Sequence, residues 1–410
     1  MGKTFMSLFS DFKKEELCQL YIYPSFPNVD MVNSCYRITD RDAIKSILPL
    51  KSVGSEVTVH EYKGEMIENK ADGKFYAKSS NNVPLKRLLR DGIWRLSHWY
   101  SKKLKVWLEK ESPDVIFLAP GYAKFIYNIA LKISKKRNIP IVTYICDDYY
   151  FLDKPKNFLG LYQHKLLQKK TLQTMNATSV MISISEEIQK KYADAFNLKT
   201  ALIMTGSDLK ISDNVVIKEK LCGFSYFGNV GINREIPLAD IGRVLDEINN
   251  ENNTDYSLNI YTKMQNEAIN AAFSGIKSIK MCGFLVGDEF IKEFSNSDCL
   301  VHVEAFDNDS IDLVKGSIST KIADSLASGI PLLAYAPEVI ASIEHLKRNN
   351  CAFIANDYNS LKLAVCEIIN NKEKRESIAK TALKVAEEYH NSVENSKRLR
   401  NIFEEICEKV

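Results

Sequence analysis

The hydrophobic positions of this chain form short apolar runs that alternate with longer amphipathic stretches. Runs such as 141–145 and 299–303 have the length and composition of buried strands, whereas the stretches between runs have helical spacing. Strands that alternate with helices in this way favour parallel sheets with helices on both faces. The predicted strands are 19–23, 114–118, 140–145, 179–183, 200–203, 224–227, 257–261, 278–282, 299–303, 331–335 and 351–354.

One polar segment interrupts this alternation. Residues 205–214 are rich in turn-forming residues, and the strand and helix patterns begin again after them. A length of 410 residues also suits two domains better than one. We therefore predict an α/β protein of two tandem doubly wound, Rossmann-like domains. Its predicted parts are a first domain at 1–205, a linker at 206–218, a second domain at 219–388 and a C-terminal helix at 389–410 that crosses back to the first domain.

The start of the chain does not follow the usual order of such domains. A helix is predicted at about 4–16, before the strand at 19–23. Because a doubly wound domain normally opens on a buried strand, we expect the first domain to lack its first strand. The polar, poorly periodic residues 51–83 are predicted to form a surface excursion.

Composition narrows the class of protein. The 55 basic and 52 acidic residues nearly balance, which argues against a nucleic-acid binder. Nine cysteines without CxxC spacing favour buried free thiols in a reducing cytoplasm. There is no run of 18 apolar residues, so no membrane-spanning helix is predicted. The six histidines lack metal-ligand spacing, and neither a metal site nor a cofactor is expected.

The topology of doubly wound sheets indicates where to look for a ligand site. Ligands bind beyond the carboxyl ends of the strands, where the strand order reverses. In the second domain this rule selects five loops that contain glycines or polar residues. The candidate donor-site residues in these loops are Gly228, Asn229, Lys263, Gly283, Phe284, Glu304, Ser319 and Thr320.

The helix that follows Ser319 and Thr320 has the strongest chemical signal. It ends at Gly329, and Pro331 cannot continue it. Exposed backbone N–H groups and the helix dipole make such an N-terminus an anion site, to which Lys321 would add a cationic donor. One turn later, Asp324 is placed to accept hydrogen bonds from ribose hydroxyls. The alternative is an ordinary helix cap with a solvated charge pair, but the position at a strand end favours the functional interpretation.

Two carboxylates, Asp147 and Asp148, follow the strand at 140–145 in the first domain. At a strand end they could position an acceptor hydroxyl or stabilise positive charge on a sugar. A role in capping or bracing the loop is an equal alternative for either residue. Asp148 is slightly preferred as the catalytic candidate.

Residues 82–110 contain all three tryptophans and eight basic residues against two acidic ones. A basic, aromatic helix of this kind can lie on an anionic membrane surface. The alternative, a helix that packs on the sheet of its own domain, is equally compatible with the pattern. We therefore expect a peripheral membrane contact through 84–110, or burial of this face.

Several motifs together resemble the retaining GT-B glycosyltransferases of bacterial capsular and surface polysaccharide synthesis (group 1, family 4-like). The segment 227–231 is similar to the loop that opens their donor domain, and Asp324 precedes Gly329-Ile-Pro331 at the spacing of their ribose-binding acidic residue. The first domain is similar to the same enzymes at 36–40, 113–116 and 184–186. At the positions where the family usually neutralises the donor diphosphate, this chain has Asn229 and Arg234.

The resemblance implies an activity. It implies a cytoplasmic hexosyltransferase, at the inner face of the membrane, that moves a sugar from a nucleotide-diphosphate donor to a hydroxyl of a glycan or lipid-linked acceptor without a metal. Glu304 would take the place of the missing first acidic residue of the family's sugar site. A GT-B nucleotide-sugar epimerase and a non-catalytic partner protein remain open, whereas the loop 228–231 is not the G-x-G-x-x-G of a dehydrogenase.

Overall fold

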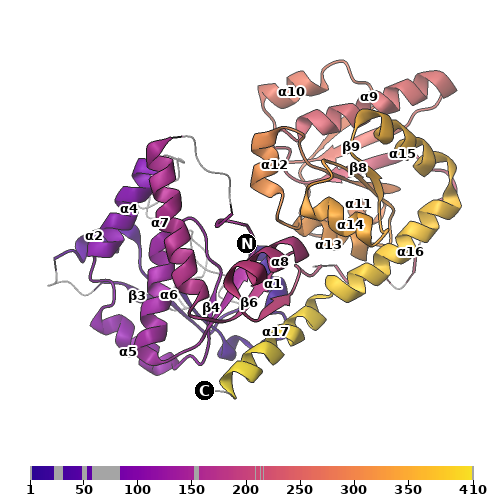
Figure 1. The fold of residues 1–410 in the computed structure, drawn as a ribbon. Helices are drawn as coiled ribbons and strands as arrows, with labels where there is room; N and C mark the ends of the chain where they lie inside the picture. The colour runs from indigo at the N-terminus through magenta and orange to yellow at the C-terminus, as the bar shows by residue number, and fades with distance from the viewer. Residues whose placement is uncertain are drawn as a thin grey trace. The chain divides into compact units, whose positions relative to one another are not determined.

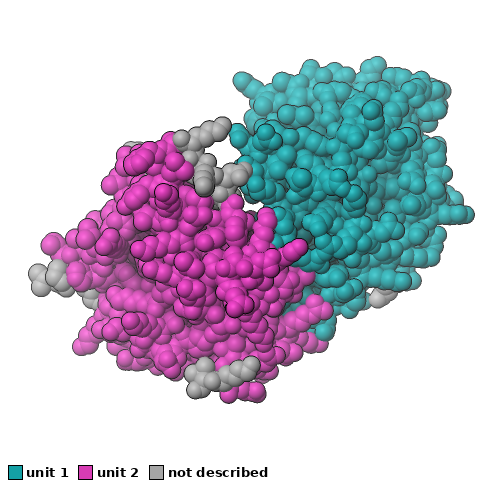
Figure 2. Space-filling view, viewed as in Figure 1, with its two compact units in different colours: residues 1–8, 184–187, 203–395 teal, residues 9–183, 188–202, 396–410 magenta. Residues whose placement is uncertain are grey.

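The computed structural model of the chain consists of two compact units (Figure 2). Unit 1 comprises Met1–Leu8, Ile184–Glu187 and Ile203–Asn395, and unit 2 comprises Phe9–Ser183, Ile188–Leu202 and Ser396–Val410. The structure describes residues 2–22, 31–48, 53–57, 84–151, 157–207, 209–212, 214–215 and 217–408.

Unit 1 contains one parallel sheet of six strands (Figure 1). The strand order is β10-β9-β8-β11-β12-β13, which in chain order reads 3-2-1-4-5-6, the order of a Rossmann fold. The predicted doubly wound class is confirmed. The strands are β8 (Gly223–Phe227), β9 (Ser257–Tyr261), β10 (Ile279–Gly283), β11 (Cys299–Val303), β12 (Leu332–Tyr335) and β13 (Phe353–Ala355).

The core of unit 1 lies on both faces of this sheet because side chains alternate along each strand. On β12, Leu333 and Tyr335 belong to one buried cluster, and Leu332 and Ala334 belong to another. The first cluster includes residues of α9 and α15, and the second includes residues of α13 and α14. The helices of unit 1 are α9 (Glu235–Asn252), α10 (Glu267–Phe273), α11 (Gly287–Ser295), α12 (Asn308–Val314), α13 (Thr320–Ala327), α14 (Ala341–Arg348), α15 (Tyr358–Asn370) and α16 (Lys372–Tyr389).

Unit 2 contains a second parallel sheet and a smaller mixed one. The parallel sheet has the order β4-β5-β6-β7, and in the other sheet β1 pairs with β2 in parallel and β2 with β3 antiparallel. Its strands are β1 (Cys18–Tyr21), β2 (Ser34–Arg37), β3 (Ser55–Val57), β4 (Ile116–Leu118), β5 (Ile141–Ile145), β6 (Thr178–Ser183) and β7 (Thr200–Leu202). Its helices are α2 (Asp40–Lys45), α4 (Pro84–Leu96), α5 (Lys102–Glu111), α6 (Lys124–Arg137) and α7 (Phe158–Met175), and α8 (Glu186–Phe196) and α17 (Ser392–Cys407) each belong partly to both units. Most of the predicted surface excursion at 51–83 lies outside the described residues.

The first helix is shorter than predicted. Helix α1 (Gly2–Leu8) belongs to unit 1, and the chain enters unit 2 directly after it. The backbone N–H of Asp11 donates to Ser396 Oγ at 3.0 Å. It therefore does not form the hydrogen bond to the carbonyl four residues earlier that would extend α1. A single 3₁₀ turn, η1 (Lys14–Glu16), replaces the end of the predicted helix at 4–16.

The tryptophan-bearing stretch at 84–110 forms two helices, α4 and α5, and its tryptophans are in the core of unit 2. Trp94, Trp99 and Trp107 are at most 5% exposed. The indole N–H of Trp94 donates to Asp40 and that of Trp107 to Ser34 Oγ, both at 2.7 Å. These side chains stabilise unit 2 from within and cannot contact a membrane surface. No helix among the described residues is long and apolar enough to cross a bilayer.

Arg375 is a buried cation that closes the end of α15, and its removal should destabilise unit 1 selectively. Its guanidinium donates to the carbonyls of Ile368 at 2.5 Å and Lys218 at 3.1 Å. Arg375→Met leaves these buried acceptors without a donor, and we expect unit 1 to lose about 2–4 kcal/mol of unfolding free energy. Denaturation followed by circular dichroism should show this loss.

The three tryptophans all lie in unit 2, so their fluorescence reports that unit alone. We expect the fluorescence transition of the Arg375→Met variant to stay in place while the dichroism transition shifts. Lys380→Met changes an exposed residue of α16, the helix that also contains Arg375. This variant should change stability by less than about 0.5 kcal/mol. Equal shifts for the two variants would contradict this account of Arg375.

Candidate functional site

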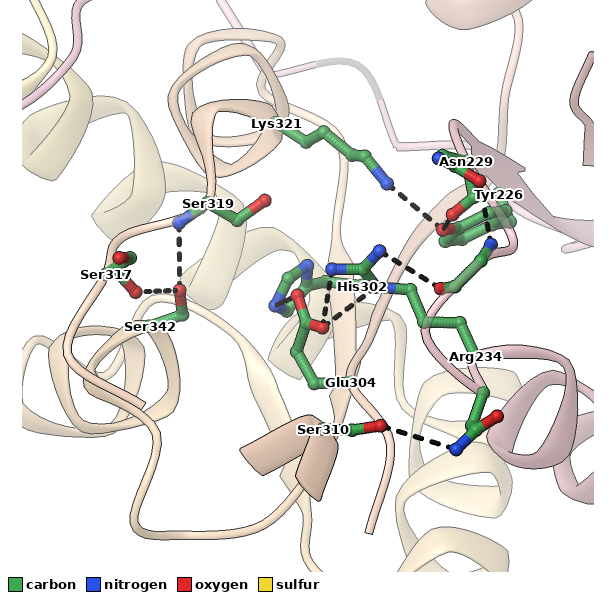
Figure 3. A network of polar contacts seen from close by, with 12 residues as sticks. Tyr226, Asn229, Arg234, His302, Glu304, Ser310, Ser317, Ser319, Lys321 and Ser342 are labelled. Atoms are coloured by element: carbon green, nitrogen blue, oxygen red, sulfur yellow. Dashed lines mark hydrogen bonds and ion pairs between the residues drawn. The ribbon is translucent and has the colours of Figure 1, made fainter. Parts of the chain in front are cut away.

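The carboxyl ends of β8 and β11 meet at the point where the strand order of unit 1 reverses. The chain leaves β8 toward one side of the sheet and β11 toward the other, yet these two strands are hydrogen-bonded neighbours. The connections therefore diverge and leave a crevice, which is the usual ligand site of such sheets. Polar side chains from β8, β11 and the start of α13 converge here (Figure 3).

The loop after β8 is held in an unusual backbone conformation. Gly228 has a φ of 144°, a value that residues with a side chain rarely adopt. Its N–H donates to the carbonyl of Tyr261 at 3.0 Å. The carbonyl of Asn229 accepts a hydrogen bond from the Tyr226 hydroxyl at 2.6 Å, and its side chain accepts one from the N–H of Gly231 at 2.7 Å. Asn229 thus shapes the loop.

Lys321, the second residue of α13, reaches back over this loop. Its Nζ lies 3.0 Å from the Tyr226 hydroxyl and 4.7 Å from the centre of the tyrosine ring. A Cβ atom at position 228 would displace the end of the lysine side chain, so the glycine leaves room for this position of Lys321. Burial, together with the nearby charge of Arg234, lowers the pKa of Lys321 to about 8. An ammonium with so little hydration is suited to bind an anion.

Arg234, just before α9, pairs with Glu304 at the end of β11. Their closest N–O distance is 2.7 Å, and the guanidinium also donates to the carbonyl of Gly231. Glu304 is only 4% exposed. Burial raises the pKa of Glu304, and the Arg234 charge opposes this rise. The carboxylate therefore holds the arginine in the crevice, a role that the sequence had not suggested.

His302 and Tyr226 belong to the site, although the sequence analysis did not select them. The Nε2 atom of His302 is buried, lies 3.8 Å from Glu304 Oε1 and makes no hydrogen bond to any described residue. Burial lowers the pKa of His302 to about 3, so its ring is neutral at physiological pH. The sequence contained a signal for His302, because a histidine stands near the end of the otherwise apolar strand 299–303.

The first turn of α13 is arranged differently from a standard capped helix. Ser319 is the N-cap residue but its side chain makes no capping bond, and its backbone N–H donates to Ser342 Oγ at 3.0 Å. Thr320 begins the helix beside Lys321. The predicted grouping of Ser319, Thr320 and Lys321 at a helix start beside β8 is therefore present, and their binding to a diphosphate stays a prediction.

Asp324 lies deeper in unit 1 and has protein partners. Its Oδ1 accepts from Ser207 Oγ at 2.9 Å, and its Oδ2 forms an ion pair with Lys3 of α1. The residue is 9% exposed. Asp324 thus connects α13 to the N-terminal helix and to the segment after Ile203. The predicted contact with ribose would have to compete with these partners, and it stays a prediction.

The remaining donor-site candidates lie at the ends of neighbouring strands. Lys263 lies two residues after β9, Gly283 is the last residue of β10, and Phe284 follows it. The Phe284 side chain is 59% exposed, and Gly283 has a φ of 81°.

The two carboxylates of unit 2 have different surroundings. Asp148 Oδ1 accepts from the backbone N–H groups of Tyr150 and Phe151 at 3.1 and 2.9 Å, and from the Tyr192 hydroxyl. Asp147 accepts a hydrogen bond from the Tyr149 hydroxyl at 2.9 Å. Asp148 thus braces its own turn, which is the structural alternative to a catalytic role, and a catalytic role for either carboxylate stays a prediction.

Comparisons with known proteins agree with this architecture. No protein-family model and no curated protein matches the chain. Among solved structures, sucrose-phosphate synthase from Thermosynechococcus elongatus is similar with a TM-score of 0.56 and 10% identity, over 78% of this chain and 80% of that one. The α,α-trehalose 6-phosphate synthase from Burkholderia multivorans has a TM-score of 0.55 and 11% identity, over 82% and 76%. At this identity the similarity establishes the fold, which is the GT-B architecture of two Rossmann-like domains.

Removal of Arg234 should leave Glu304 as an unpaired buried charge. We expect Arg234→Met to lower the unfolding free energy of unit 1 by roughly 3–5 kcal/mol at pH 7.5. The loss should shrink toward pH 5, because the folded protein can then protonate Glu304. In the Arg234→Met variant, the pKa of Glu304 in the folded protein lies further above its pKa in the unfolded chain. The stability of unit 1 therefore falls as the pH rises from the unfolded pKa to the folded one.

Chemical denaturation at several pH values would measure this. The double variant Arg234→Met/Glu304→Gln removes both charges and should recover part of the lost stability. Arg243→Met, at a half-exposed arginine on α9, serves as the control. A loss for Arg234→Met that is independent of pH would contradict the proposed pairing.

Proposed function

We propose that this protein is a glycosyltransferase that moves a sugar from a nucleotide-diphosphate donor to a hydroxyl of a glycan or lipid-linked acceptor. The observation that carries the proposal is the pair of cations, Lys321 and Arg234, at the strand-order reversal of a GT-B unit. Both are largely removed from water, and a diphosphate is the ligand whose charge matches them.

The chemistry requires stabilisation of the leaving group. The bond between the sugar's anomeric carbon and the phosphate oxygen breaks, and its electron pair stays on the nucleoside diphosphate. The acceptor oxygen forms the new bond, and its proton passes to the departing diphosphate. Positive groups aimed at the diphosphate favour this step because they interact more strongly with the charge that develops on it. Lys321, Arg234 and the N–H groups at the start of α13 are the residues we assign to this task.

We propose that this charge stabilisation needs no metal ion, and that the nucleotide sugar is a substrate with no further cofactor. Among the described residues, no group of three or more His, Cys, Asp or Glu side chains could hold a metal ion. Ser319, Thr320, Gly228 and Asn229 would supply neutral donors and backbone contacts around the phosphates. Nucleotide binding should accordingly be the same in EDTA and in magnesium.

The finer features of the proposal rest on the motifs shared with the retaining GT-B enzymes of surface polysaccharide synthesis. These features are a hexosyl donor, retention of configuration, ribose contact through Asp324, base or sugar contacts from Lys263, Gly283 and Phe284, and action at the cytoplasmic side. On the acceptor side, we favour Asp147 over Asp148, since Asp148 is already committed to the turn that it braces.

Lys321 should contribute measurably to nucleotide affinity. We expect Lys321→Met to weaken the binding of the preferred nucleoside diphosphate at least tenfold, roughly 1.4 kcal/mol. Calorimetry with a panel of nucleoside diphosphates would identify that nucleotide and measure the change. Lys280→Met, at an exposed lysine of β10, should bind like the unchanged protein. Failure of every nucleotide to bind the unchanged protein would refute the proposed function.

The affinity should also depend on pH in one direction. A bound diphosphate favours the ammonium form of Lys321, whose pKa in the free site is about 8 because of burial and the neighbouring Arg234. Affinity should therefore be nearly constant between pH 7 and 8 and then fall by up to about tenfold per pH unit. His302 stays neutral over this range because its pKa is lowered to about 3.

Calorimetry in two buffers of different ionisation enthalpy would detect the associated proton uptake above pH 8. The Lys321→Met variant should show neither the uptake nor the decline in affinity. An affinity that is flat to pH 9.5 in the unchanged protein would show that Lys321 does not hold the diphosphate.

A further inference from the structure

Two neighbouring helices of unit 2, α4 and α7, carry an uneven charge. The helix α4 has four basic residues and one acidic residue, Asp91, and α7 has three basic residues and no acidic one. The whole chain is nearly balanced, with 55 basic and 52 acidic residues. This part of unit 2 is therefore distinctly more positive than the protein as a whole.

The beginnings of the same helices expose large apolar side chains. Leu85 and Leu89 are one turn apart on α4 and are 50% and 60% exposed. On the first two turns of α7, Phe158, Leu159 and Tyr162 are 81%, 43% and 51% exposed. Their exposure contrasts with Trp94 on the opposite side of α4, which is 1% exposed and packs in the core.

The fold brings these five side chains to one end of unit 2. Helices α6 and α7 each connect two parallel strands, so both begin at the carboxyl edge of the sheet. Arg87, in the first turn of α4, lies over the ring of Tyr122, just before α6, 4.3 Å from its centre. The beginning of α4 is therefore at that same edge, and α4 lies beside α7 (Figure 1).

The charge around these side chains is basic. Lys86 on α4 and Lys165 on α7 are exposed beside them. We call Leu85, Leu89, Phe158, Leu159 and Tyr162, with Lys86 and Lys165, the apolar–basic patch. A nucleic acid would use the lysines but gain nothing from exposed leucines, because its backbone is charged and leucine offers no stacking surface.

We propose that the apolar–basic patch docks on an anionic lipid bilayer. Leucine and phenylalanine side chains that project from helix ends can enter the boundary between headgroups and acyl chains, while lysines reach the lipid phosphates. Each basic residue near an anionic surface adds to the attraction, and salt weakens that part. This inference goes beyond the proposed function, because it concerns residues of unit 2, whereas the nucleotide site is formed by residues of unit 1.

The test is sedimentation of the full-length chain with lipid vesicles. We expect binding to vesicles that contain phosphatidylglycerol, little binding to pure phosphatidylcholine, and a large loss of binding at 0.5 M salt, where the screening length is about 4 Å. The double variant Leu89→Ser/Phe158→Ser should lower the partition coefficient at least tenfold, since two large apolar side chains no longer enter the bilayer.

The matched control is Val339→Ser/Leu363→Ser, which replaces two side chains of unit 1 that are 65% and 73% exposed. It should bind vesicles like the unchanged protein. Tryptophan fluorescence would confirm that unit 2 remains folded in the first variant, and nucleotide affinity, measured on the same samples, should be the same in all of them. A failure of nucleotide binding would affect the proposed function alone.

Three outcomes would overturn the proposal. The unchanged protein could fail to bind anionic vesicles at low salt, or the Leu89→Ser/Phe158→Ser variant could bind as well as its control. In the third, the patch would join two copies of the chain. Sedimentation velocity would then show a dimer that the same variant dissociates, with no binding to vesicles.

Discussion

The pairing of β8 with β11 is the constraint on which the candidate site depends. These two strands are neighbours in the sheet, but the connections that leave them go to opposite sides. The sheet therefore cannot fill the space beyond their carboxyl ends with its own connections. Because Gly228 has no side chain, Lys321 can reach over the loop, and Glu304 holds Arg234 at the same crevice. Without that reversal of strand order, the two cations would not converge.

The charges in this crevice are subject to two opposing effects, attraction of a diphosphate and the cost of burying cations. A diphosphate site requires positive charge with little hydration, yet two buried cations repel each other and are costly to remove from water. Glu304 offsets one of them through its ion pair with Arg234, and the second, Lys321, has its pKa lowered to about 8 mainly by burial. The site thus has one fully paired cation and one whose charge responds to the ligand. His302 stays neutral beside them and adds no further positive charge.

The sequence predicted the architecture better than the roles of single residues. The class of fold was correct because apolar runs of four or five residues between amphipathic stretches have few other solutions. The structure also brings the candidates Gly228, Arg234, Glu304 and Lys321 together, while their binding to a ligand stays a prediction. For 84–110 the sequence left membrane contact and burial as equal alternatives, and the structure shows that the tryptophans are buried against Asp40, Ser34 and Phe125, while leucines of α4 are exposed. Helical periodicity cannot distinguish a buried aromatic face from an exposed one when both faces contain large apolar residues.

By itself, the sequence determined the two parallel sheets, the order of their elements and the strand ends at which ligand chemistry gathers. These features follow from local periodicity and from the general topology of doubly wound sheets. Only the tertiary structure decided which charged groups pair. Arg234 and Glu304 are 70 positions apart, Asp324 and Ser207 are 117 apart, and Lys3 and Asp324 are 321 apart. The packing of whole helices and strands determines these partners, because the energy of a charge pair depends on the distance between its members and on their burial. A local pattern of residues in the sequence specifies neither the distance nor the burial.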